Sequence, residues 1–153
     1  ATIERAKSAG DGDLVLGGGR PADLAEGAYV EATVFRNVRP DSDLGQNECF
    51  GPVVSVIPFA NDEEGVAIAN ATRFGLGAYL HTGDLNRALS LAHRLEAGSV
   101  QINGAPTARE NAPFGGRGLS GYGREGGRDG IQEFVRVKNV AIARPAAAAL
   151  SAR

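Results

Sequence analysis

The 153-residue chain contains no methionine, not even at position 1, and only a single cysteine, Cys49. The missing methionine indicates a cut or processed start. One cysteine cannot form an internal disulfide, which fits a reducing cytosol. The chain also lacks a long apolar run and a charged segment leading into an apolar one at its start. We therefore expect a protein that is neither exported nor membrane-spanning, and we predict a cytoplasmic location.

A surplus of charge of one sign is also missing, because 16 Lys and Arg against 18 Asp and Glu give a net charge of -2. A nucleic-acid-binding face or a polybasic membrane patch needs a basic surplus, so we expect neither partner. His81 and His93 are solitary, and no Cys/His cluster has ligand spacing, so we predict no metal site. The length favours one domain with a substantial core, and the 22 glycines, which follow no strict period, mark turns.

Three β segments are predicted before the first well-marked helix. We expect a short strand at 14–16, a second at 29–38 and a buried strand at 53–59, where apolar residues form a continuous run. Asn61 then begins a helix, with Glu64 three residues later in a capping-box arrangement. Residues 2–9 before these strands are helix-permissive and end at Gly10, a plausible C-cap.

A strand at 76–81 follows, and Asp84 caps the next helix, which leads into a strand at 99–103. That helix carries an apolar stripe at helical spacing, formed by Leu85, Ala88, Leu89, Ala92 and Leu95. Strands that alternate with helices pair in parallel through right-handed connections. The order predicts the α/β class, with a layered sheet of parallel core strands and flanking helices.

The C-terminal part is loop-like and glycine-rich over 104–128, with a short helix near 129–133. Residues 134–143 are predicted to form an edge strand for oligomerisation, since valines alternate with basic residues there and an unpaired, partly apolar edge seeks a partner. Residues 144–153 have too little apolar bulk to pack and are predicted to form a flexible tail.

Glu48 and Phe50 stand two residues apart, directly before the rigid bend of Gly51-Pro52. In an extended chain this spacing places both side chains on one face. A carboxylate is a two-point acceptor for a ribose diol, and an aromatic ring offers a flat apolar wall. The residues alone leave an alternative open, in which Glu48 satisfies the amides of a turn and Phe50 packs in the core.

The run Glu48-Cys49-Phe50-Gly51-Pro52-Val53 resembles the nucleotide-ribose motif of the NAD(P)-dependent aldehyde dehydrogenase superfamily. The resemblance continues in order through Gly75-Leu76, Leu95–Gly98, Ile102–Gly104, Pro113–Gly116, Ser120–Glu125 and Val137-Lys138. It covers nearly all of residues 1–143 and concerns the C-terminal portion of that family. It implies a partial catalytic domain at 1–133, the oligomerisation strand at 134–143 and the flexible tail at 144–153.

The resemblance implies oxidation of an aldehyde to a carboxylic acid with NAD or NADP. Glu48 would hold the nicotinamide-side ribose and Phe50 would flank the ring. Phe114 would line the substrate channel, although core packing is an equally good interpretation from sequence. The variable stretch 104–112, which includes Ala108, would tune the aldehyde accepted. It resembles bacterial benzaldehyde-, salicylaldehyde- and vanillin-type members more than the betaine-aldehyde ones.

No catalytic residue is assigned in this chain. The family's nucleophilic cysteine lies in an upstream Gly-Gln-x-Cys-type motif with no counterpart here, and no His or Lys close in sequence would activate Cys49, which we interpret as structural. The G-x-G-x-x-G pattern occurs at Gly116 and again at Gly121. A dinucleotide loop directly follows a strand and is followed by an acidic strand end, so we interpret 115–126 as a glycine-rich crossing instead.

Three hypotheses follow. The first is a C-terminal fragment of an aldehyde dehydrogenase that is inactive alone and binds no cofactor tightly, because a ribose acceptor without a pyrophosphate site loses most contacts to a dinucleotide. The second is a non-catalytic module that self-associates. The third is a weak nucleotide-binding protein that uses Glu48 and the glycine-rich loop. Under the first two, the expected partner is a second copy or a full-length aldehyde dehydrogenase subunit.

Overall fold

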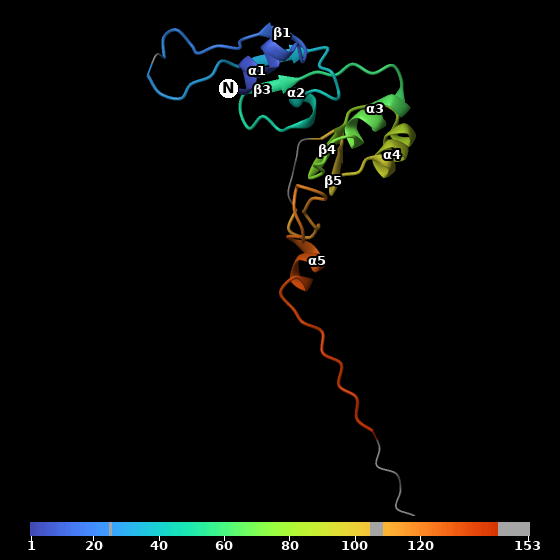
Figure 1. Ribbon diagram of the computed structural model, residues 1–153. Coiled ribbons are helices and arrows are strands. Elements are labelled where there is room, and N and C mark those ends of the chain that lie inside the picture. The colour runs from blue at the N-terminus through green and yellow to red at the C-terminus, as the bar shows by residue number, and fades with distance from the viewer. Residues whose placement is uncertain (25, 105–108, 144–153) are drawn as a thin grey trace, which may run out of the picture.

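The computed structural model describes residues 1–24, 26–104 and 109–143. Helices and strands follow one another in a mixed α/β order, which confirms the predicted class. The elements are α1 (Thr2–Ala9), β1 (Asp13–Leu16), β2 (Thr33–Arg36), α2 (Asp43–Gln46), β3 (Val53–Ser55), α3 (Asp62–Asn70), β4 (Gly77–Leu80), α4 (Leu85–Arg94), β5 (Ser99–Ile102) and α5 (Gly127–Gln132). Figure 1 shows two packed units, an N-terminal unit (residues 1–57) and a C-terminal unit (residues 61–133).

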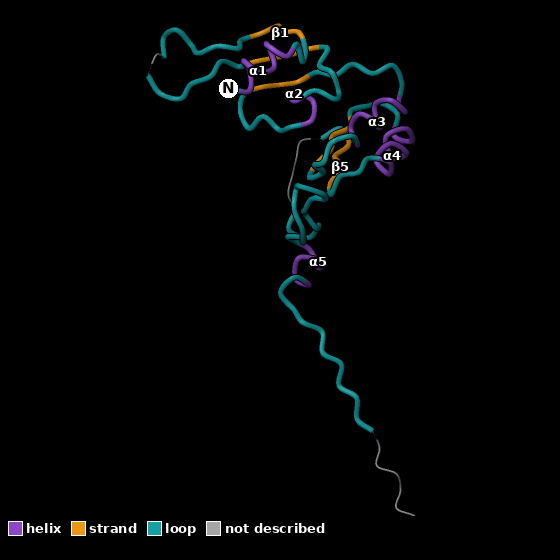
Figure 2. The backbone as a smooth tube through the Cα atoms, in the orientation of Figure 1, coloured by secondary structure: helices purple, strands orange, loops and turns teal. Residues whose placement is uncertain are grey.

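The N-terminal unit is built on a three-stranded sheet in the order β1-β2-β3 (Figure 2). β2 runs antiparallel to β1 and parallel to β3. The core of the unit lies against this sheet and consists of Ala6, Phe35, Val38 and Leu44, with Ile3, Val53 and Ile57 packed around them. The fully buried ring of Phe35 joins the helices of this unit to its central strand.

The predicted buried strand at 53–59 is corrected by the structure. β3 covers only Val53–Ser55, and the side chains of Val54, Val56 and Phe59 are exposed. Alternate side chains of a strand point to opposite faces, and here only the face of Val53 meets the core. Backbone bonds to the β2 segment continue one residue further, at Val56, and Pro58, which has no N–H to donate, follows soon after.

The C-terminal unit contains β4 and β5, which pair in parallel as predicted. Both predicted helix starts are confirmed. The Asn61 side chain accepts a hydrogen bond from the Glu64 N–H at 3.0 Å, and the Glu64 carboxylate accepts one from the Ala60 N–H at 2.7 Å. Asp84 likewise accepts from the Arg87 N–H at 3.0 Å. These local signals place α3 and α4 where the sequence puts them.

Two other expectations for this unit need correction. The strands of the described chain form two sheets, because β3 pairs with β2 and not with β4. The predicted apolar stripe of α4 is also only partly buried: Ala88 is inside, whereas Leu85 and Leu89 are exposed. Leu91, which was not part of that stripe, is buried instead. α4 packs on β5 across a narrow contact, so one line of small and medium side chains is enough to fill it.

Beyond α5 the chain leaves the body of the molecule in an extended path (Figure 1). Residues 134–143 pair with no strand among the residues that the structure describes, so the predicted edge strand is not confirmed. The predicted tail at 144–153 lies outside the described residues. None of the helices in the described ranges is both long and apolar enough to cross a bilayer.

Candidate functional site

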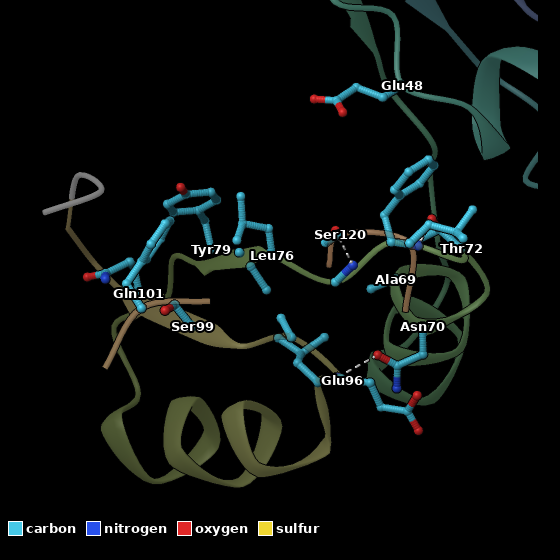
Figure 3. A pocket seen from close by; sticks show the side chains of 18 of the residues that line it. Glu48, Ala69, Asn70, Thr72, Leu76, Tyr79, Glu96, Ser99, Gln101 and Ser120 are labelled. Atoms are coloured by element: carbon cyan, nitrogen blue, oxygen red, sulfur yellow. Dashed lines mark hydrogen bonds between the residues drawn. The ribbon is translucent and has the colours of Figure 1, made fainter. Parts of the chain in front are cut away.

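A hollow of about 800 Å³ lies between the two units. Pockets that hold small molecules or cofactors commonly have volumes of about 300–1,000 Å³. Its floor is one face of the β4-β5 sheet, where Tyr79 and Gln101 are register partners and stand side by side (Figure 3). Gly77 and Ser99, two residues earlier on each strand, form the next pair on the same face. The opposite face of β5 packs against α4, so the polar face is left to line the hollow.

Glu48 reaches over this floor from the N-terminal unit, as Figure 3 shows. Its carboxylate is exposed and makes no hydrogen bond with the described residues. The alternative in which Glu48 satisfies the amides of a turn therefore finds no support. A carboxylate with all of its acceptor positions free, at the edge of a large hollow, is suited to a diol.

The residue before Glu48 is firmly held. Asn47 ends α2 in an extended conformation, with φ -114° and ψ 136°. Its side-chain amide donates a hydrogen bond of 2.6 Å to Asp43, and Arg5 donates one of 3.2 Å to the other oxygen of the same carboxylate. The bond from Asn47 first, and that from Arg5 second, lower the pKa of Asp43 below its ordinary value of 3.8. Asp43 therefore stays charged and anchors the segment 47–50, the arm that carries Glu48.

Phe50 does not share the hollow with Glu48. Its ring is 97% exposed and is not among the lining residues, so the alternative of core packing does not apply to it. The period-of-two argument predicted a common face for the two side chains, but residues 48–50 are outside any strand. Cys49 between them is half-buried and also outside the lining. The structure thus brings Glu48 into the hollow and leaves Phe50 free at its margin.

Phe114 lines the hollow, and its role in a substrate channel stays a prediction. It forms a two-residue antiparallel bridge with Glu125, with N–H to C=O distances of 2.7 Å in both directions. Its ring is 41% exposed, which excludes ordinary core packing. Ala108, the other predicted substrate-side residue, lies outside the described residues. Phe114 and Glu48 are therefore far apart in the sequence but line the same hollow.

The glycine-rich segment 115–126 crosses the starts of β4 and β5. The Gly75 carbonyl accepts hydrogen bonds from the Gly98 N–H at 3.0 Å and the Arg117 N–H at 3.1 Å. The Ser120 hydroxyl accepts from the Gly75 N–H at 3.0 Å. Irregular backbone, and not a strand, precedes the segment. This geometry agrees with the interpretation as a crossing and does not resemble a dinucleotide loop.

Three site residues were missed by the sequence analysis: Tyr79, Gln101 and Asn70. The register that joins Tyr79 to Gln101 follows from aligning the two parallel strands, so the signal was present but unused. Asn70 ends α3, donates to the Arg94 carbonyl at 2.9 Å and accepts from the Glu96 N–H at 2.9 Å. This pair of hydrogen bonds depends on the approach of α3 to the end of α4, for which the sequence carries no local signal.

No group of His, Cys, Asp and Glu side chains in the described ranges could hold a metal ion. For a nucleotide the residues fit better, because the free carboxylate of Glu48 lines the hollow and the exposed ring of Phe50 follows two residues later in the chain. The carboxylate is suited to the two hydroxyls of a ribose, and the ring is suited to one face of a flat heterocycle.

Comparison with known proteins gives one consistent result. The model of the aldehyde dehydrogenase family matches residues 1–140. A betaine aldehyde dehydrogenase of Cereibacter sphaeroides (strain ATCC 17023) is 45% identical over 142 residues, which cover 93% of this chain and 29% of that protein. Another, from Rhizobium leguminosarum bv. trifolii, is 41% identical over 143 residues, with the same two shares.

Solved structures agree. The crystal structure of an NAD-dependent aldehyde dehydrogenase from Sinorhizobium meliloti superposes with a TM-score of 0.86 at 39% identity, over 95% of this chain and 29% of that one. The structure of a Mycobacterium tuberculosis aldehyde dehydrogenase complexed with NAD+ superposes with a TM-score of 0.82 at 35% identity, over 87% of this chain and 27% of that one. The chain thus spans under a third of the length of the proteins it matches. Neither curated relative is named for an aromatic aldehyde, and the loop's resemblance to benzaldehyde-type members stays a prediction.

Proposed function

This chain belongs to the aldehyde dehydrogenase family, and from that membership we propose that it supplies one wall of the active site of an NAD(P)-dependent enzyme that oxidises an aldehyde to a carboxylic acid. The observation that carries the proposal is the shared hollow, which Glu48 and Phe114 both line. The family membership favours this function over the other two hypotheses, a non-catalytic module and a free-standing nucleotide-binding protein.

In this function each residue has a passive role. The free carboxylate of Glu48 would accept hydrogen bonds from the nicotinamide-side ribose, and the exposed ring of Phe50 would cover one face of the nicotinamide. Phe114 and the floor residue Tyr79 would exclude water from the aldehyde end. The dinucleotide itself, when bound, accepts the hydride from the substrate.

We propose that the chain alone performs no oxidation. The described lining of the hollow contains no cysteine thiol, since Cys49 is not among its residues. Its described lining also lacks the helix N-terminus with a preceding glycine loop that usually holds a pyrophosphate. Nucleotide binding by the chain alone should therefore be weak, with the ribose contact as its main part.

Residues 134–143 are proposed as the segment that associates with a second copy or with a full-length subunit. Their apolar side chains are open to solvent: Val137, for example, is 95% exposed, and Val140 and Ile142 are exposed as well. An extended, partly apolar segment without a paired neighbour gains both hydrogen bonds and burial when it joins a sheet edge. The domain division at residue 133 and the cytoplasmic location likewise stay proposals.

The proposed nucleotide contact is tested by NMR. The 15N-labelled chain is titrated with nicotinamide mononucleotide and with NAD+ at millimolar concentration. We expect chemical-shift changes at 47–51 that saturate weakly and disappear in Glu48→Gln, which keeps the shape of the side chain but removes its charge. The matched control is Glu26→Gln, which changes an exposed glutamate outside the hollow. Shifts centred on 115–126, or none at all, would contradict the proposal.

A further inference from the structure

Arg73 lies where three segments far apart in sequence meet. Its guanidinium donates a hydrogen bond of 3.5 Å to the side-chain oxygen of Asn47, the residue before Glu48. Its backbone carbonyl accepts from the Leu119 N–H at 2.9 Å. The next residue, Phe74, forms an antiparallel bridge with Gly118. One residue therefore touches both the arm that carries Glu48 and the crossing that follows Phe114.

The contact with the crossing is close. A Cβ placed on Gly118, whose φ is +58°, would lie 2.3 Å from the Arg73 carbonyl oxygen. No ordinary side-chain carbon approaches an oxygen so closely, so the crossing rests directly on the backbone of residue 73. The stretch from Phe114 to Gly118 is thus fixed relative to Arg73 by backbone contacts that do not depend on the identity of its side chain.

The contact with the arm depends on the side chain alone. The Asn47 amide uses its nitrogen to bind Asp43 within the N-terminal unit and its oxygen to accept from Arg73 in the C-terminal unit. The main packings of helices and strands lie within each unit, α1 on α2 in one, and α3 and β5 against α4 in the other. The arm can therefore shift as the units move, unless a bond such as this one ties it down.

We propose that Arg73 is a positioning residue whose bond to Asn47 sets how far the Glu48 carboxylate stands from Phe114 across the hollow. The meaning of that spacing for ribose and aldehyde rests on the proposed function, but the spacing itself does not. An arginine suits the task because its long stem spans from the margin of the floor to the arm, and its planar head donates in a fixed direction. A shorter polar side chain at position 73 would leave the arm untied.

The chain offers a direct measurement, because Cys49 is its only cysteine and adjoins Glu48. A nitroxide is attached to Cys49, and a second to Ser90→Cys on the exposed side of α4. Dipolar EPR then reports the distance distribution between the arm and the C-terminal unit in the ligand-free chain. We compare Arg73→Ala, Asn47→Ala, the double variant, and Arg73→Lys, which keeps a cationic donor.

The expected result is a broader distribution in Arg73→Ala and partial recovery in Arg73→Lys. Asn47→Ala, which also removes the bond to Asp43, should broaden the distribution at least as much, and the double variant should broaden it no further than Asn47→Ala does. Arg128→Ala, which removes an exposed arginine of α5, should leave the distribution unchanged. Arg73→Ala with the distribution of that control would overturn the proposal. If Arg73→Ala loses its cooperative thermal unfolding, Arg73→Gln decides, since its shorter polar side chain should leave the arm untied. An unchanged distribution in that variant would also overturn the proposal.

The two proposals can fail separately. A broadened distance distribution in Arg73→Ala, together with no chemical-shift changes near Glu48 on addition of nucleotide, would support the positioning role and contradict the cofactor role. Nucleotide-induced chemical-shift changes near Glu48, together with an unchanged distance distribution in Arg73→Ala, would support the cofactor role and contradict the positioning role. Both measurements use the same 153-residue chain.

Discussion

Gly98 lies directly beneath Gly115: a Cβ on Gly98 would fall 1.7 Å from the Gly115 carbonyl oxygen. The N–H of Gly98 also donates to the Gly75 carbonyl, so the backbones of three segments meet at one point beside the hollow. The missing side chain is therefore a structural requirement. It lets the glycine-rich crossing lie flat on the starts of β4 and β5, and this contact places Phe114.

Gly98→Ala should consequently destabilise the chain. Forcing atoms into a filled site typically costs about 1–3 kcal/mol, and a backbone obstacle places this change at the upper end. The free energy of unfolding from urea titration measures the effect. Gly83→Ala is the matched control, since a Cβ at Gly83 meets nothing within 4 Å. It should change stability by less than about 0.5 kcal/mol. Equal effects of the two variants would refute the close approach.

Asn61→Ala should remove the cap of α3. The Asn61 side chain accepts from the Glu64 N–H, and the loss of such a cap costs about 0.5–2 kcal/mol. Asn61→Asp, which keeps the acceptor, should retain nearly all of the stability. Circular dichroism during thermal unfolding is a suitable measurement. A variant with alanine as stable as the one with aspartate would show that the capping bond contributes nothing.

Asp62 should contribute to the acid limb of the stability profile. The hydrogen bond from Arg87, and then the positive charges of Arg87 and Arg94, lower the pKa of Asp62 below its ordinary value of 3.8. A carboxylate with a lowered pKa in the folded state adds stability above the unfolded-state value and loses that contribution as the pH falls through the folded-state value. Above pH 5 the contribution is therefore complete.

In Asp62→Asn, the difference in free energy of unfolding from the parent should be largest above about pH 5 and shrink towards pH 3. Asp23→Asn, which removes an exposed carboxylate without an ion pair among the described residues, should shift the profile little. Urea titrations at several pH values provide the data. A difference that grows as the pH falls would reverse the sign and contradict the argument.

Residues 134–143 should decide the oligomeric state. If residues 134–143 associate, Val137→Lys, which adds a charge to a 95% exposed apolar position, should shift the chain towards monomer in light scattering after size exclusion. Lys138→Arg, a change that keeps the charge of the neighbouring residue, should not. A parent chain that is strictly monomeric at every concentration tested would remove the proposed association.

The sequence predicted what local chemistry determines. Asn61 and Asp84 begin helices because each carries an acceptor three residues before an N–H that needs one, and both helices start there. Parallel pairing of β4 with β5 was also predicted, because a helix between two strands leaves little alternative. Glu48 was singled out by its motif, and it lies in the lining of the hollow, while its contact with a ribose stays a proposal.

The sequence predictions that failed concern features set by contacts between residues far apart in the sequence. The pairing of β3 with β2, and the exposure of Val54 and Phe59, follow from which layers meet, and no local pattern encodes that. Phe50 was expected to share a face with Glu48, but period-two reasoning holds only inside a regular strand, and residues 47–50 are irregular. The bond of Arg73 to Asn47 joins positions 26 residues apart and leaves no trace in either segment.

The central claim is that this chain provides a wall for cofactor and aldehyde but neither the attacking group nor the pyrophosphate site. The most direct test is to incubate the purified 153-residue chain with an aldehyde and NAD+ or NADP+ and to follow absorbance of the reduced coenzyme together with the acid product. We predict no aldehyde-dependent formation of either. Stoichiometric turnover of aldehyde into acid and reduced coenzyme, with no second protein in the preparation, would contradict the claim.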